Sequence, residues 1–207
     1  MKPFSRNEII AASAIILVIF AVTLINMSWA LRRARDAQRM QDLGAISEAL
    51  HSYQKDFGFF PPSENGKIKA CKSSNFDEIA DLLRKEKDFN KTLFISGLTT
   101  CEWGKDKLAD VNDESYPAYL SIIPQDPKAK EKVAYYYISN SERFQLYSYL
   151  EGENSEEGYN LGIVDRSLSC GNKICSFGKS YGETPLNISI EEYEQELLEI
   201  QKGGNKQ

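Results

Sequence analysis

The feature that most limits the fold of this chain is a run of 23 residues, 9–31, that contains no charged side chain. A helix needs about 20 apolar residues to cross the hydrocarbon layer of a bilayer, which is roughly 30 Å thick, because each residue adds only 1.5 Å. The run is therefore long enough to span a membrane with some tilt. It is also longer than the core of a cleaved signal peptide, and no small-x-small cleavage site closes it.

The same helix is predicted to continue beyond the run. Residues 32–57 contain no proline, and five apolar residues recur there at spacings of 3 and 4, which places them on one helix face. These residues are Leu43, Ile46, Leu50, Tyr53 and Phe57. We therefore expect one helix over residues 9–57, on the order of 70 Å long, with a membrane-spanning half and an amphipathic half. Pro61 and Pro62 end it.

The rest of the chain is large enough for one globular domain of class α+β, packed on the amphipathic half of the helix. Residues 132–139 and 143–151 are rich in strand formers and flank a turn, which predicts a β-hairpin in a small antiparallel β-sheet. Residues 159–164 are predicted to form a third strand.

Two shorter helices are predicted from their start signals. Asn75 is placed to cap a helix that ends near Lys87, and Ser189 has capping-box spacing to Glu192 at the start of a final helix over residues 189–200. The segments 58–75, 88–115 and 165–184 are expected to be loops, the second of them with one short strand or helical turn. The predicted organisation is a leader-like N-terminus (1–8), a transmembrane helix (9–31), its amphipathic continuation (32–60), a globular domain (61–184), and a C-terminal helix with its tail (185–207).

Charge is distributed unevenly along the chain. Residues 1–57 carry seven Lys and Arg against five Asp and Glu, whereas residues 58–207 carry 18 against 25. An acidic domain argues against nucleic acid as its partner. The loop that follows residue 150 holds Glu151, Glu153, Glu156 and Glu157. We interpret it as a solvated acidic loop, because it lacks the alternating Asp/Asn ladder of an EF-hand calcium site.

Four cysteines lie beyond the apolar run: Cys71, Cys101, Cys170 and Cys175. An even number in a membrane-tethered domain predicts two disulfides and an oxidising compartment. Of the three possible pairings we favour Cys71–Cys101 with Cys170–Cys175, because the segment CGNKIC offers Gly171 and Asn172 for a tight turn. Buried free thiols are the alternative. Zinc is disfavoured, since there is no Cys-x-x-Cys pair and the only histidine, His51, lies on the long helix.

The sequence offers no pattern that indicates catalysis. One histidine identifies no triad, and neither a phosphate-binding glycine loop nor a metalloprotease helix motif occurs. We therefore expect a protein that is not an enzyme and has no cofactor.

A set of features at both ends of the long helix points to a family. Met1-Lys2-Pro3 is a short basic segment, Phe4 follows it, and Glu8 comes four residues later, at the start of the apolar run. The run continues into RRARDAQRMQDLGAISEALHSYQKDFGFFPP, and the segments YLSIIPQDP, AYYYIS and FQLYSYLE follow. In these features the chain resembles the type IV pilin and type II secretion pseudopilin family over residues 4–62 and 116–151.

The resemblance implies a structural subunit of a filament. It assigns Phe4 as the first mature residue and Glu8 as the acid that pairs with the N-terminal ammonium of a neighbouring subunit. It implies partners in other pilin-like subunits, the membrane and an assembly machinery. The chain departs from the family in that Pro3 stands where the leader ends in Gly, and that Ser5-Arg6-Asn7 is polar. Removal of the leader and methylation of Phe4 are therefore left open.

Two signals disagree on the orientation of the chain. The basic residues Arg32, Arg33, Arg35 and Arg39 follow the run, and the positive-inside rule then places the domain in the cytoplasm. The cysteines indicate the opposite side, and in the family such basic residues coexist with an exported domain. We therefore expect a single-pass protein of the cytoplasmic membrane with an extracytoplasmic domain. The alternative function is a membrane-anchored binding module that forms no filament.

Overall fold

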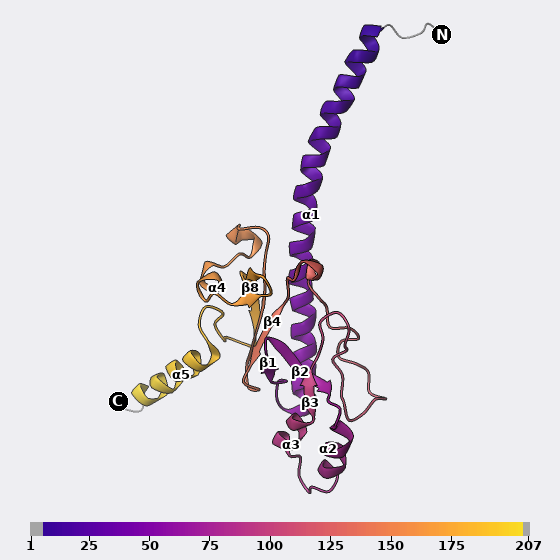
Figure 1. The fold of residues 1–207 in the computed structure, drawn as a ribbon. Coiled ribbons are helices and arrows are strands. Elements are labelled where there is room, and N and C mark those ends of the chain that lie inside the picture. Colours follow the sequence, from indigo (N-terminus) through magenta and orange to yellow (C-terminus); the bar gives the residue numbers. More distant parts are fainter. Residues whose placement is uncertain (1–5, 205–207) are drawn as a thin grey trace.

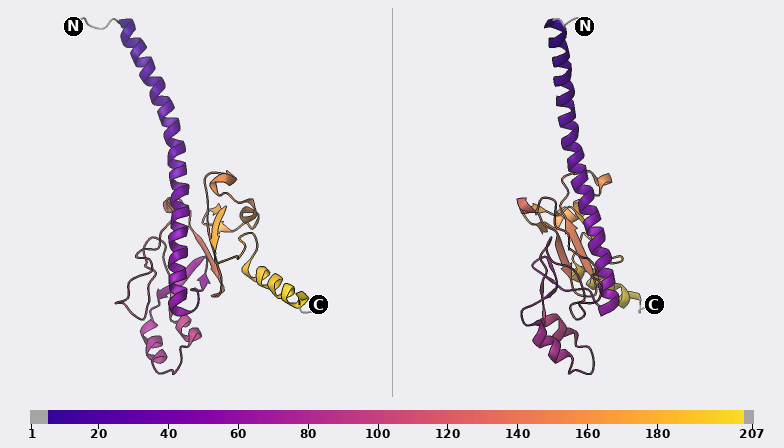
Figure 2. Two further views of the ribbon diagram at one scale, coloured as in Figure 1. Left: turned by 180° about the vertical axis from the view of Figure 1, so that it is seen from behind. Right: turned by 90° about the vertical axis from the view of Figure 1, so that its right-hand side faces the viewer.

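One long helix organises the fold. The computed structural model describes residues 6–204, and in it α1 (Arg6–Phe57) runs unbroken for 52 residues, about 78 Å at the usual helical rise. The first half of α1 projects from the domain and the second half lies along it (Figures 1 and 2). The predicted long helix and the α+β class are confirmed.

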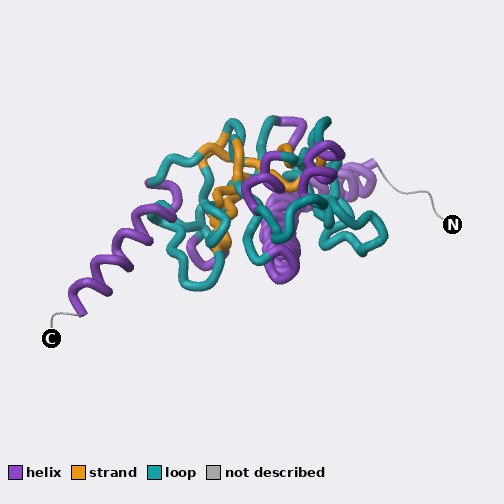
Figure 3. Tube along the Cα trace, turned by 90° about the horizontal axis from the view of Figure 1, so that it is seen from below, coloured by secondary structure: helices purple, strands orange, loops and turns teal. Residues whose placement is uncertain are grey.

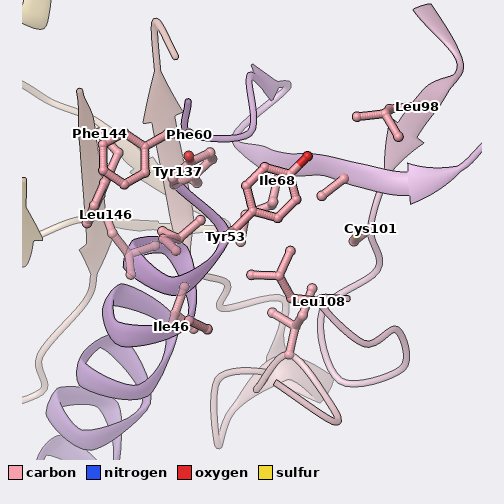
Figure 4. Packing of buried hydrophobic residues seen from close by; sticks show 14 of the residues in the cluster. Ile46, Tyr53, Phe60, Ile68, Leu98, Cys101, Leu108, Tyr137, Phe144 and Leu146 are labelled. Atoms are coloured by element: carbon pink, nitrogen blue, oxygen red, sulfur yellow. The ribbon is translucent and has the colours of Figure 1, made fainter. Parts of the chain in front are cut away.

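The amphipathic half of α1 forms the base of the hydrophobic core. Leu43, Ile46, Leu50 and Tyr53 are all buried, as their helical spacing predicts. Phe57, at the end of the helix, stacks on the ring of Phe94 and is partly buried. Figure 4 shows Ile46 and Tyr53 of the helix among side chains of both larger sheets and of two loops. The sheet residues are Ile68, Tyr137, Phe144 and Leu146, and the loop residues are Phe60 and Leu108.

The first sheet follows α1 directly. Strands β1 (Ser63–Glu64), β2 (Lys67–Lys72) and β3 (Leu98–Thr100) pair antiparallel in the order β1-β2-β3. The expected loop over 58–75 is therefore wrong. Asn65 and Gly66 both have positive φ, 52° and 73°, and form the tight hairpin turn that an Asn-Gly pair favours. Ile68 and Ala70 face the core from β2.

Two short helices stand between β2 and β3. Helix α2 (Phe76–Leu83) begins where predicted and ends before Lys87. Asn75 occupies the predicted N-cap position, but its side chain makes no capping hydrogen bond. Helix α3 (Lys91–Ser96) is capped by Asn90, whose side chain accepts a hydrogen bond from the Leu93 backbone N–H. Together with β3, α3 gives residues 88–115 more regular structure than expected.

The second sheet contains the predicted hairpin. Strands β4 (Tyr136–Ser139) and β5 (Phe144–Ser148) pair antiparallel, and β8 (Phe177–Ser180) pairs with the other edge of β5. Every residue of the central strand β5 is buried. The third strand was expected over residues 159–164, and that prediction is wrong. This segment is helix α4 (Leu161–Asp165), because the Asn160 side chain caps it by accepting from the Gly162 N–H.

The remaining elements are short, apart from the last helix. Strands β6 (Ser169–Cys170) and β7 (Lys173–Ile174) form a small hairpin inside the segment expected to be a loop. Two 3-10 turns, η1 (Ala129–Glu131) and η2 (Ser155–Glu157), lie at the end of the domain nearer the exposed half of α1 (Figure 1). The final helix α5 (Ile190–Gly204) begins with the predicted capping box, since Ser189 and Glu192 exchange hydrogen bonds of 2.8 and 3.1 Å.

Candidate functional site

The exposed half of α1 is the candidate assembly and membrane site. Its most apolar 18-residue window is 0% buried within the protein, although its side chains are mainly large aliphatic groups. A core helix of a soluble protein would bury these side chains. By length and composition, α1 is the one helix in residues 6–204 that can cross a membrane.

Glu8 lies in the first turn of this helix and is exposed. The position is favourable for a carboxylate, because the first turn carries the positive end of the helix dipole. Glu8 directly precedes the apolar run, so an environment that buries the run also brings this carboxylate to the edge of a low-dielectric region. Pro3 and Phe4, which the resemblance assigns to processing, lie outside the described residues.

At the other end of the run, arginines connect α1 to the domain. Arg32 and Arg33 both approach Glu157, with N–O distances of 3.7 and 3.3 Å. Arg35 donates two hydrogen bonds of 2.7 Å, one to each carboxylate oxygen of Glu151. Such bidentate pairs are among the stronger charge-assisted contacts in proteins. These arginines therefore pair with acids of the folded domain.

Arg39 lies at the centre of a buried charge cluster, formed with Arg35, Asp36, Asp126 and Glu151. Its side chain is fully buried and donates to Asp126 through Nε and Nη2, at 2.7 and 3.1 Å. Its Nη1 donates to Asp36 and Glu151, at 2.7 and 3.1 Å. The cluster joins three segments that are distant in sequence and fixes the domain against α1.

Asp36 extends this junction to the backbone. Its two carboxylate oxygens accept hydrogen bonds from the backbone N–H groups of Glu151 and Gly152, at 2.9 and 3.0 Å. The start of the acidic loop is therefore attached to α1 by main-chain as well as side-chain contacts.

The cluster shifts the pKa values of Glu151 and Arg39. Hydrogen bonds from Arg35, and then from Arg39, lower the pKa of Glu151 to about 2, although partial desolvation acts in the opposite direction. Burial alone would lower the pKa of Arg39, but its hydrogen bonds to Asp126, Glu151 and Asp36 raise it. Glu151 has only 13% of its side chain exposed, so the interpretation of the whole acidic loop as solvated is wrong at this residue. Glu153 and Glu156 are exposed, as expected.

The structure contains the favoured pair of disulfides. Cys71–Cys101 joins the end of β2 to the residue after β3, and Cys170–Cys175 encloses the β6-β7 hairpin. The two bonds use all four cysteines. Within residues 6–204 no group of three or more His, Cys, Asp or Glu side chains is arranged to hold a metal ion.

His51 is part of an aromatic contact between α1 and the second sheet. Its ring centroid lies 5.5 to 6.0 Å from those of Phe60, Phe144 and Tyr181. The ring is half-buried, and packing explains its position on the helix.

No protein-family profile, curated protein or solved structure matches this chain. The likeness to pilins and pseudopilins therefore depends on the residues quoted above.

Sequence reasoning identified the exposed helix and the cysteines but missed the charge cluster. A signal was present, because Arg39 precedes Leu43 by four residues and so continues the apolar stripe of the helix. An arginine on a core-facing stripe requires buried acids, but their identity is not evident from the helix alone.

Proposed function

We propose that this protein is a structural subunit of a filament of the type IV pilus or type II secretion pseudopilus kind. One observation carries the proposal. The first half of α1 is apolar and exposed, and the second half contributes buried side chains to the hydrophobic core of an α+β domain. The exposed half would stay in the membrane before assembly and pack against the same half of neighbouring copies afterwards. The domain would cover the outside of the filament and contact the assembly machinery.

The proposed location is the cytoplasmic membrane, crossed once, with the domain on the extracytoplasmic side and finally in a surface or periplasmic filament. The two disulfides support an oxidising compartment. The arginines that follow the apolar run indicate the opposite orientation, because the positive-inside rule places them and the domain in the cytoplasm. In the folded protein Arg35 and Arg39 are paired with domain carboxylates, which accounts for these two arginines on whichever side the domain lies.

The test is the substitution Glu8→Ala in the full chain, with Glu48→Ala as a matched control on an exposed position of the same helix. Filament and membrane fractions are separated, and the subunit is quantified in each. We expect Glu8→Ala to remain in the membrane and to be lost from filaments, and Glu48→Ala to behave as the wild type. Normal incorporation of Glu8→Ala would overturn the assigned role of Glu8.

Crosslinking distinguishes the filament subunit from the membrane-anchored binding module. Cysteines are introduced one at a time over residues 9–31, where the chain has no cysteine of its own. A filament predicts crosslinked ladders that recur with the helical period of 3.6 residues. Absence of any such ladder would favour the binding module.

A further inference from the structure

The domain meets α1 directly at the end of the apolar run. Leu31 is the last residue of the run, and Arg32 and Arg33 both approach Glu157 of η2. The polar headgroup layer of a bilayer is about 5–8 Å thick on each side, which a helix crosses in about four residues. With the run across the hydrocarbon layer, η2 and the two arginines therefore lie among the lipid headgroups.

Trp29 supports this depth. Its side chain is 58% exposed, and the guanidinium carbon of Arg32 lies 5.0 Å from the centroid of its ring. Tryptophan is enriched where hydrocarbon meets headgroups, because its ring is apolar and its N–H is a hydrogen-bond donor. A position two residues before the end of the run is typical of that boundary.

The two arginines at this depth share one carboxylate. Glu157 lies 3.7 Å from a nitrogen of Arg32 and 3.3 Å from one of Arg33, and both distances exceed those of good charge-assisted hydrogen bonds. Nε of Arg32 has no hydrogen-bond partner within residues 6–204, and the side chain of Arg33 is 66% exposed. The two guanidinium groups can therefore donate hydrogen bonds to a further anionic group, such as a phosphate.

An open pocket of about 540 Å³ lies beside these arginines, between α1 and the acidic loop. Arg33, Ala37 and Met40 line it from the helix, and Glu156 and Glu157 line it from η2. Figure 1 shows η2 at the end of the domain from which the exposed half of α1 projects. The pocket thus joins apolar and charged groups of both signs at the depth of the headgroups.

The charges that can face a ligand in this pocket are balanced. Asp36 also lines it, but the two carboxylate oxygens of Asp36 accept hydrogen bonds from backbone N–H groups and from Arg39. This leaves two arginines and two glutamates. A ligand with one anionic and one cationic group complements them, whereas a ligand with a single sign of charge meets groups of its own sign.

We propose that this pocket binds the headgroup of a zwitterionic phospholipid whose cation is a primary ammonium group. The phosphate oxygens accept hydrogen bonds from Arg33, with Arg32 beside it, and the ammonium group donates to Glu156 and Glu157. A choline headgroup has the same net charge but no N–H to donate, so it binds less well. A headgroup with a phosphate and no cation is repelled by the two carboxylates. The inference rests on the membrane location in the proposed function.

The experiment places a photocrosslinking amino acid at position 37 of the full chain. Ala37 is exposed, lines the pocket and lies about one helical turn beyond Arg33. The protein is reconstituted into vesicles with equal amounts of phosphatidylethanolamine, phosphatidylcholine and phosphatidylglycerol, and mass spectrometry identifies the attached lipids. We expect adducts of phosphatidylethanolamine to exceed those of either other lipid by about threefold, the size expected for one exposed charge pair.

The same amino acid at position 38 is the matched control. Gln38 is exposed and lies at nearly the same depth, but it does not line the pocket. Figures 2 and 3 show the domain on one side of α1, so neighbouring positions can differ in what they face. Adducts at position 38 should follow the composition of the vesicles.

Substitutions then separate the two halves of the headgroup. Arg33→Gln should lower the yield of phosphatidylethanolamine adducts at position 37 by about threefold. Glu156→Gln with Glu157→Gln should remove the preference over phosphatidylcholine. Glu153→Gln, an exposed change outside the pocket lining, should leave both unchanged.

Adducts at position 37 that follow the vesicle composition, or the same enrichment at position 38, would overturn the inference. Position 18, in the middle of the apolar run, should give adducts of all three lipids, and their absence would refute the membrane location and the lipid site together. The cysteine ladder over residues 9–31 tests the filament separately. Enrichment at position 37 without a ladder keeps the lipid site and removes the filament, and a ladder without enrichment does the reverse.

Discussion

Arg39 of α1 and Asp126 of the loop before η1 form two hydrogen bonds with each other, and neither side chain has any exposed surface. The two residues are 87 positions apart in the sequence. A buried ion pair of this kind does little for stability compared with apolar residues of similar shape, but removal of one partner leaves the other charge unpaired. The pair therefore fixes how the domain sits on the helix.

Substitution Arg39→Met should destabilise the domain by about 3–5 kcal/mol, because Asp126 and its neighbouring carboxylates then lose their common cation. Chemical denaturation of the full chain in detergent, followed by near-ultraviolet circular dichroism, measures the change. Arg84→Ala serves as the control, since Arg84 and Asp81 form an ion pair with both side chains exposed, and it should have little effect. Equal effects of the two substitutions would contradict the central role of Arg39.

Stability should fall as the pH is lowered from about 5 towards 2. The folded pKa of Glu151 is about 2, below the ordinary value of 4.5, so the unfolded chain takes up its proton first. The contribution is complete above the unfolded pKa and is lost as the pH falls through the folded one, with a size of about 3 kcal/mol for this shift.

The variant Glu151→Gln isolates this effect. Asp42 has a raised pKa, because burial outweighs its hydrogen bond from Tyr135, and it contributes a slope of the opposite sign. Asp42 is present in both proteins, so its contribution cancels when the free energies of unfolding of wild type and variant are subtracted at each pH. We expect the wild type to lose more stability between pH 5 and pH 2 than Glu151→Gln, and parallel pH profiles would disprove the assignment.

Glycine at position 66 is required by both backbone and space. Gly66 has a φ of 73°, and an added Cβ would lie 2.4 Å from Cδ2 of the Tyr136 ring. Gly58 has a similar φ of 78°, but nothing lies within 4 Å of its added Cβ. Gly58→Ala should therefore cost only the backbone strain of about 1–2 kcal/mol, and Gly66→Ala should cost that plus the steric clash. Thermal unfolding of the two variants gives the comparison, and a smaller effect at position 66 would refute it.

The two disulfides should differ in their effect on stability. The Cys71–Cys101 bond closes a sequence separation of 30, and Cys170–Cys175 closes one of 5. Loop-closure entropy then gives about 3.6 kcal/mol for the first and about 2 kcal/mol for the second. Replacement of each pair by serines, followed by denaturation without reductant, should show the larger loss for Cys71–Cys101. The reverse order would mean that strain or unfolded-state structure dominates.

The elements that the sequence predicted well are those with local signals. An uncharged run followed by a regular apolar spacing is sufficient to predict α1, and the Ser189 and Glu192 pair is sufficient to predict the start of α5. The β1-β2 hairpin also had a local signal in Asn65-Gly66, which was outweighed by the prolines and glycines around it.

The errors have physical causes. Residues 159–164 contain strand formers, but the Asn160 cap starts a helix that leaves Leu161 69% exposed. Glu151 was grouped with the acids that follow it, and only the folded chain shows that Arg35 and Arg39 remove it from solvent. The charge cluster and the third strand of the second sheet depend on contacts between distant segments, which no local pattern encodes.

The early position of α1 in the chain has a consequence for synthesis. Its amphipathic half is complete at Phe57, but the last strand that covers the core ends at Ser180. At 5–20 residues per second a ribosome needs on the order of ten seconds to make the chain between these points. Until the chain reaches Ser180, Leu43, Ile46 and Leu50 lack part of the core that covers them in the folded protein, and until it reaches residue 126 Arg39 lacks its partner Asp126. The newborn protein is therefore expected to be most vulnerable to proteases in this interval, when the exposed half of α1 is already complete.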